Sequence, residues 1–163
     1  MLSKPIQDAI NNQIQKEFES AYLYLGMAAH FEADTLPGFA KWMRKQFEEE
    51  QGHAMRFYEY VNNQRGEVIL QNVSAPAAKF GKPLEIFQQV LAHEQKVTAS
   101  IKAIYELALK EGDQATQIAL QWFLTEQVEE EKNASDAIER IKMVGDLPFG
   151  VLFLDQHVFG TRK

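Results

Sequence analysis

Apolar residues recur along the chain at spacings of three and four, in four long stretches separated by glycine and proline. This period is typical of amphipathic α-helices. We expect these helices at about 4–34, 38–65, 83–111 and 113–144. Pro5 and Pro83 suit the first turn of a helix, and Gly112 and Gly145 suit the residue just past a helix end. Asp113 is the expected N-cap of the fourth helix.

The joints between the helices predict their arrangement. Tight turns make the first and second helices antiparallel, and likewise the third and fourth. About 17 residues, from Gly66 to Lys82, join the second helix to the third and can span about 56 Å, whereas a helix of about 28 residues is about 42 Å long. The pattern therefore predicts an all-α four-helix bundle in which a long crossover makes the middle helices parallel. The crossover carries its own expected apolar anchors, which are Val68, Ile69, Leu70 and Val73.

A shorter apolar segment follows the fourth helix, from Leu147 to Phe159. It predicts a fifth helix of about ten residues. The segment could dock on its own bundle, but it is very apolar for a bundle whose seams are already filled. We therefore favour a contact with another subunit.

Length and composition narrow the function classes. A chain of 163 residues suits one domain, 1–163. The absence of cysteine excludes disulfides, thiolate metal sites and cysteine nucleophiles. No signal peptide or membrane span is recognisable, so a cytoplasmic protein is expected. The net charge of −6, with only Arg162 and Lys163 as a basic pair at the C-terminus, argues against a nucleic-acid partner.

Each helical seam of apolar residues is interrupted near its middle by a glutamate. The interrupting residues are Glu17, Glu50, Glu94 and Glu130, with Gln127 beside the last. The tight turns place all four at a similar depth, so we expect them to meet in one zone of the core. Buried carboxylates repel one another and lose hydration, at several kcal/mol each. No lysine or arginine lies on the seams, and bound metal cations are the simplest compensation.

His53 makes this prediction more specific. Glu50 and His53 form a Glu-x-x-His sequence, and this spacing places both side chains on one helix face. The sequence is weak by itself, but on a seam with three other glutamates it predicts a di-metal site. Oxygen ligands with one imidazole suit iron, manganese or zinc.

The whole chain resembles the ferritin superfamily and, among its branches, bacterial non-haem ferritin. The resemblance implies a first iron site at Glu17, Glu50 and His53, and a second at Glu50, Glu94 and Glu130. It implies that Gln127 and Tyr24 lie beside the iron pair. It also implies a third iron site at Glu49, Glu126, Glu129 and Glu130.

Departures from other branches are informative. The fourth helix has no second Glu-x-x-His, which oxygenases and bacterioferritins carry. Gln51 stands where bacterioferritin has its haem-ligating methionine, so no haem is expected. A chain without cysteine lacks the iron domain of rubrerythrins. Gln117 and Leu120 occupy the places of acidic channel residues in animal ferritins, which does not favour an acidic threefold access route.

The resemblance implies a ferroxidase that oxidises Fe(II) with O2, or with H2O2, and stores Fe(III) mineral inside a homo-oligomeric cage of 24 subunits. Two Fe(II) ions can give one electron each, so oxygen is reduced without releasing a radical. A neutral Gln127 fits a site that releases Fe(III). Two alternatives stay open. One is a non-storage di-iron oxidase or peroxidase with a substrate pocket at the metals. The other is a structural bundle or a DNA-protecting mini-ferritin.

Overall fold

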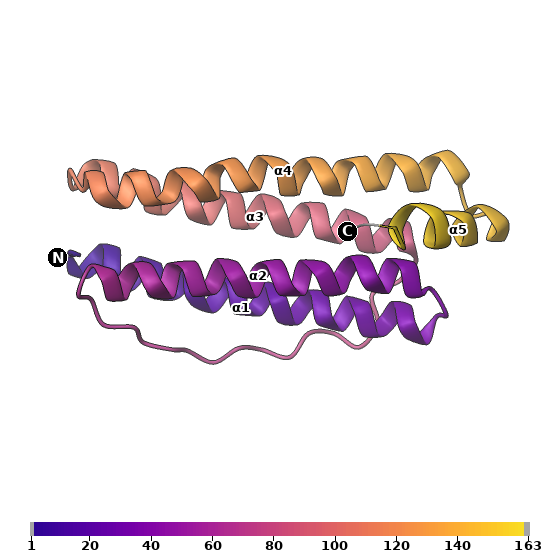
Figure 1. The fold of residues 1–163 in the computed structure, drawn as a ribbon, viewed down its shortest axis with the longest axis horizontal. Helices are drawn as coiled ribbons and strands as arrows, with labels where there is room; N and C mark the ends of the chain where they lie inside the picture. Colours follow the sequence, from indigo (N-terminus) through magenta and orange to yellow (C-terminus); the bar gives the residue numbers. More distant parts are fainter. Residues whose placement is uncertain (1, 162–163) are drawn as a thin grey trace.

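The computed structural model describes residues 2–161, so the basic pair Arg162 and Lys163 lies outside the described residues. The fold is all-α, as predicted, and each long helix begins and ends within two residues of its predicted bounds (Figure 1). The helices are α1 (Lys4–Ala33), α2 (Pro37–Asn63), α3 (Pro83–Lys110), α4 (Gln114–Val144) and α5 (Pro148–Leu154), and a π-helix, η1 (Asp155–Phe159), follows. Within residues 2–161, none of the helices is both long and apolar enough to cross a membrane.

The long connection between α2 and α3 runs along the bundle, so α2 and α3 are parallel, as predicted (Figure 1). Of its predicted apolar anchors, Val68 packs against the core, whereas Ile69, Leu70 and Val73 are exposed, so the prediction was wrong for these three. Polar side chains of α1 also hold the connection. The Asn11 amide donates to the Glu67 carbonyl at 2.9 Å and accepts from the Ile69 amide at 3.1 Å. An extended segment leaves its peptide groups unpaired, and side-chain amides satisfy them where a neighbouring strand is lacking.

The N-termini of the helices are capped in different ways. Asp113 caps α4, as predicted, by accepting from the Thr116 amide at 3.0 Å. No side-chain cap of this kind begins α2; instead, the Asp155 carboxylate of η1 accepts from the Phe39 amide at 2.8 Å. Gly38 makes this approach possible, because a Cβ there would lie 1.8 Å from the Asp155 carbonyl oxygen.

The C-terminal segment docks on its own bundle through one face only. Phe159 stacks on Phe39 with ring centres 4.4 Å apart, and Leu154 is buried. On the other side, the exposed apolar side chains are Leu147, Phe149, Leu152 and Phe153. The fold is therefore compatible with docking of this segment on its own bundle and with a contact to another subunit through its exposed side.

The core consists of two apolar clusters with a polar zone between them. In α1, one cluster ends at Ile14 and the other begins at Tyr24, with Glu17 in the interval. In α3, the same interval between Val90 and Val97 holds Glu94. The corresponding intervals of α2 and α4 hold Glu50, His53, Gln127 and Glu130, all buried. The glutamates thus interrupt the core at matched depth.

Candidate metal centre

Glu17, Glu50 and His53 form the most compact group of possible ligands. One ligand atom of each lies within 4.8 Å of the others. His53 and Glu50 are one turn apart on α2, with Nδ1 3.4 Å from Oε2, and α1 brings Glu17 to them. Two carboxylates and one imidazole in this space suit a single divalent cation of the iron, manganese or zinc type.

The carboxyl groups of Glu17 and Glu50 are buried with few hydrogen-bond donors around them. Within residues 2–161, Glu17 Oε2 and both Glu50 carboxylate oxygens have no hydrogen-bond partner. Burial, followed by the charge of Glu50, raises the pKa of Glu17 well above its ordinary value. Burial, followed by the charge of Glu94, does the same to the pKa of Glu50. A bound cation would remove both penalties, so the residues present fit a metal site.

Glu94, on α3, is held by two donors. Tyr24 Oη donates to its Oε1, and the Gln127 amide donates to its Oε2 at 3.0 Å. Burial, followed by the charge of Glu94, raises the pKa of Tyr24 well above its ordinary value, so the phenol stays protonated and remains a donor. The structure thus places Tyr24 and Gln127 beside the predicted ligands.

Glu130 belongs to a second compact group, with His53 and Glu126, whose ligand atoms again lie within 4.8 Å of one another. The Gln46 amide donates to Glu130 Oε2 at 2.8 Å. Burial, followed by the charge of Glu94, raises the pKa of Glu130 to about 7. Among the described residues, the predicted second set of Glu50, Glu94 and Glu130 does not form such a group.

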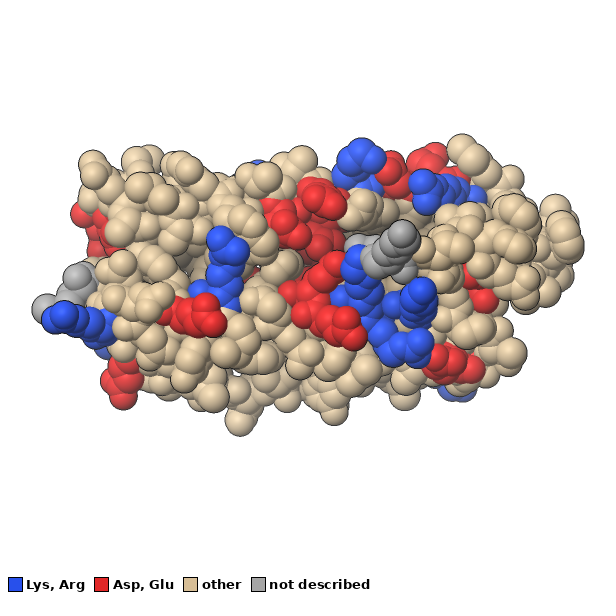
Figure 2. Space-filling model, viewed as in Figure 1, with Lys and Arg blue, Asp and Glu red and all other residues tan. Residues whose placement is uncertain are grey.

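The residues expected at a third site are only partly together. Glu126 and Glu130 share the group with His53, whereas Glu129 is exposed. Glu49 lies 3.6 Å from the Lys45 ammonium. Glu49 and Glu126 also line a depression of about 420 Å³ that reaches His53. In the view of Figure 2, acidic side chains gather near the middle of the molecule, where the α1–α2 pair faces the α3–α4 pair.

The family follows from comparison with known proteins. Residues 7–144 match the family model described as a ferritin-like domain. The chain belongs to the ferritin family. The resemblance noted in the sequence is therefore confirmed.

The similarity extends over nearly the whole chain. A bacterial non-heme ferritin of Bacteroides fragilis is 39% identical over 97% of this chain and 98% of its own length. One of Staphylococcus aureus is 36% identical over 99% and 97%. A crystal structure described as an open pore ferritin of the archaeon Archaeoglobus fulgidus is 40% identical, with a TM-score of 0.97 and full coverage of both chains.

Two glutamines of this ferritin-family chain were missed in the sequence. Gln13 donates to Glu17 Oε1 at 2.7 Å, and Gln46 donates to Glu130. Gln13 lies on α1 four residues before Glu17, and Gln46 lies on α2 four residues before Glu50. Each glutamine therefore shares a helix face with a seam glutamate. That spacing was visible in the sequence, but the partner of Gln46 is on α4 and needed the fold.

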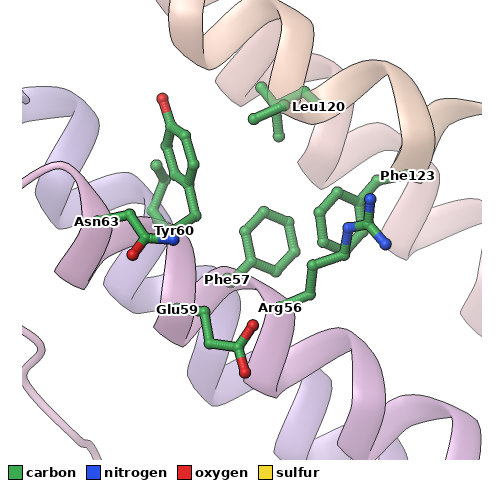
Figure 3. Close-up of a pocket in the computed structure, with 9 residues that line it drawn as sticks. Arg56, Phe57, Glu59, Tyr60, Asn63, Leu120 and Phe123 are labelled. Carbon is green, nitrogen blue, oxygen red and sulfur yellow. The ribbon is translucent and has the colours of Figure 1, made fainter.

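A second cavity of about 320 Å³ lies beside the centre, between α2 and α4 (Figure 3). Stacked rings of Phe57 and Phe123 form part of its wall, with centres 3.8 Å apart. Arg56 and Glu59 add charge at its edge. None of the five predicted core ligands lines this cavity.

Proposed function

We propose that this ferritin-family chain is an iron-storage ferroxidase that oxidises Fe(II) with O2, or with H2O2, and keeps the Fe(III) product as mineral inside a cage. The observation that carries the proposal is the set of buried carboxylate oxygens on Glu17 and Glu50 that lack a hydrogen-bond partner among residues 2–161, beside His53. Such oxygens are the donors that hard divalent cations prefer. In this proposal iron is the substrate, and it enters as Fe(II).

The proposed ligands follow the family resemblance. Glu17, Glu50 and His53 would hold the first iron. Glu50, Glu94 and Glu130 would hold the second, and Glu94 would then exchange a hydrogen bond from Tyr24 or Gln127 for a bond to the metal. Glu126 would join Glu49, Glu129 and Glu130 around a third iron at the depression.

The reaction balances with two irons. Two Fe(II) ions give two electrons to O2, which takes two protons and leaves as H2O2, with two Fe(III) formed. Anionic oxygen ligands favour Fe(III) over Fe(II), so they drive the oxidation. The depression beside His53 is lined by three glutamates, Glu49, Glu59 and Glu126, against one arginine, Arg56, and this excess of negative charge makes it a suitable path for cations to the pair.

Oxidation assays test this part directly. Fe(II) is added in air to metal-free protein, and Fe(III) absorbance and oxygen consumption are followed. We expect fast oxidation with about two Fe(II) per O2, strongly reduced in Glu50→Ala, which removes the shared ligand. Glu48→Ala is the matched control, because Glu48 is an exposed glutamate of the same helix. Slow oxidation in the parent, or equal rates in Glu50→Ala, would refute the proposal.

Storage requires an assembly, which we propose to be a homo-oligomeric cage of 24 copies in the cytoplasm. Exposed apolar side chains at Leu70, Leu147 and Phe149 support burial between subunits. Twenty-four copies of an 18.7 kDa chain amount to about 450 kDa, which light scattering after gel filtration would reveal. A dimer would instead favour a non-storage oxidase or peroxidase. The cavity of Figure 3 does not reach the ligands, so it does not supply the substrate pocket at the metals that this second candidate needs.

A further inference from the structure

A chain of hydrogen bonds connects the surface of the bundle to Glu17. The exposed Lys16 ammonium donates to Ser100 Oγ at 2.6 Å. Ser100 Oγ donates to Gln13 Oε1 at 2.6 Å, and Gln13 Nε2 donates to Glu17 Oε1 at 2.7 Å. Ser100 belongs to α3 and the other three residues belong to α1, so the chain also crosses between two helices.

The donors of this chain all point toward the glutamate. A lysine ammonium can only donate, so Ser100 Oγ accepts from Lys16 and its own hydrogen remains for Gln13. The Gln13 amide then turns its oxygen to Ser100 and its NH2 group to Glu17. The reversed amide would place its oxygen against the Glu17 carboxylate, which is unfavourable for two acceptors.

Gln13 is fully buried, and its amide holds one carboxylate oxygen of Glu17. A buried amide is destabilising unless its polar atoms are bonded, and here Ser100 and Glu17 supply both partners. The bond occupies Glu17 Oε1. The other oxygen, Oε2, lacks a hydrogen-bond partner within residues 2–161 and belongs to the carboxylate that groups with Glu50 and His53.

We propose that Gln13 is a positioning residue for the metal centre. Held by Ser100, it fixes the rotamer of Glu17 and leaves one carboxylate oxygen, Oε2, for a divalent cation. Without this bond no amide donor holds Oε1 of Glu17, and a bound cation must itself orient the carboxylate. Hydrogen-bonding partners of metal ligands contribute about 10–100-fold to metal affinity in other sites.

Co(II) is a suitable probe because its visible absorption reports coordination and it needs no oxidant. Metal-free full-length protein is titrated with Co(II), followed by absorbance and calorimetry. Gln13→Leu should lower the affinity for the first Co(II) about 10-fold and change its visible spectrum, since Glu17 can then bind through both oxygens. Ser100→Ala should lower the affinity by a smaller factor than Gln13→Leu does, because Gln13 can still donate to Glu17, and Ser100→Thr, which keeps the hydroxyl, should restore it.

Gln117→Leu is the matched control, because it removes a helical amide that donates to the Ala108 carbonyl at 3.3 Å, outside the polar zone. We expect parental affinity and spectrum from it. Parental affinity and spectrum in Gln13→Leu, or an equal loss in Gln117→Leu, would overturn the inference. If circular dichroism shows that Gln13→Leu does not fold, the Co(II) affinities of Ser100→Ala and Ser100→Thr are compared instead. Equal affinities for these two variants would overturn the inference.

The positioning role rests on the proposed function for the identity of the natural cation. The experiments nevertheless distinguish a failure of the positioning role from a failure of the proposed function. If the parent does not oxidise Fe(II) while Gln13→Leu still weakens Co(II), the proposed ferroxidase is wrong and the positioning role stands. If the parent oxidises Fe(II) quickly while Gln13→Leu binds Co(II) as the parent does, only the positioning role is wrong.

Discussion

Glu130 allows the energetic penalty of the metal-free centre to be measured. Its pKa is raised from an ordinary value of 4.5 to about 7, mainly by burial and then by the charge of Glu94. The folded chain therefore binds this proton more tightly than the unfolded chain. The associated stability is fully present below pH 4.5 and is lost as the pH rises through about 7. The difference corresponds to about 3 kcal/mol of unfolding free energy above pH 7.

The substitution Glu130→Gln removes this charge while keeping an oxygen that can accept from the Gln46 amide. At pH 8 it should stabilise the metal-free protein by about 3 kcal/mol, which raises the unfolding midpoint by roughly 6–12 °C. At pH 4.5 the parent carboxyl is protonated and the two proteins should unfold together.

Thermal unfolding of metal-free protein between pH 4.5 and pH 8, at one protein concentration, provides the assay. Glu129→Gln is the control, because that side chain is an exposed neighbour on the same helix and should follow the parent. A parent that becomes more stable from pH 5 to pH 8, or a Glu130→Gln variant no more stable than the parent at pH 8, would refute the reasoning.

Two substitutions test the contacts of α5 and η1 with the bundle, and a third tests the metal centre. Gly38→Ala should lower the unfolding midpoint by several degrees and make α5 sensitive to protease, because a Cβ would lie 1.8 Å from the Asp155 carbonyl oxygen. Asp155→Ala removes the acceptor of the Phe39 amide and should lower the free energy of unfolding by about 1–2 kcal/mol in denaturant titrations. Zn²⁺ at 100 times its dissociation constant should raise that free energy by about 2.7 kcal/mol in the parent, and Glu50→Ala should lose most of the gain.

The helices and their order could be predicted because these features depend on local sequence. Apolar spacing sets the buried face of each helix, and Asp113 caps its own helix. The attachment of the crossover could not be predicted in the same way. Leu70 is apolar yet exposed, since an extended segment over α1 is held where Asn11 can bond its peptide groups. The role of Asp155 was also hidden, because its partner Phe39 lies 116 positions away in the chain.

The same distinction applies to the metal centre. The seam position of each glutamate predicted the shared zone, and the i, i+3 spacing predicted the contact of Glu50 with His53. Only the packed structure could show which carboxylate oxygens, those of Glu50 and one of Glu17, have no hydrogen-bond partner among the described residues. Glu94 lies at the predicted depth, but Tyr24 and Gln127 both bond it, so it is held differently from Glu50.

The position of the centre between two apolar clusters explains how the chain tolerates it. Four carboxylates and one imidazole on four helices would separate or hydrate if nothing else held the helices together. On one side of them the aromatic rings of Phe57 and Phe123 stack, and on the other side Phe31 stacks on Phe39 with ring centres 5.1 Å apart. These clusters supply the stability that the charged zone removes. The repulsion among the glutamates is then available to favour a cation, since binding relieves in one step the penalties that burial imposes on their charged forms.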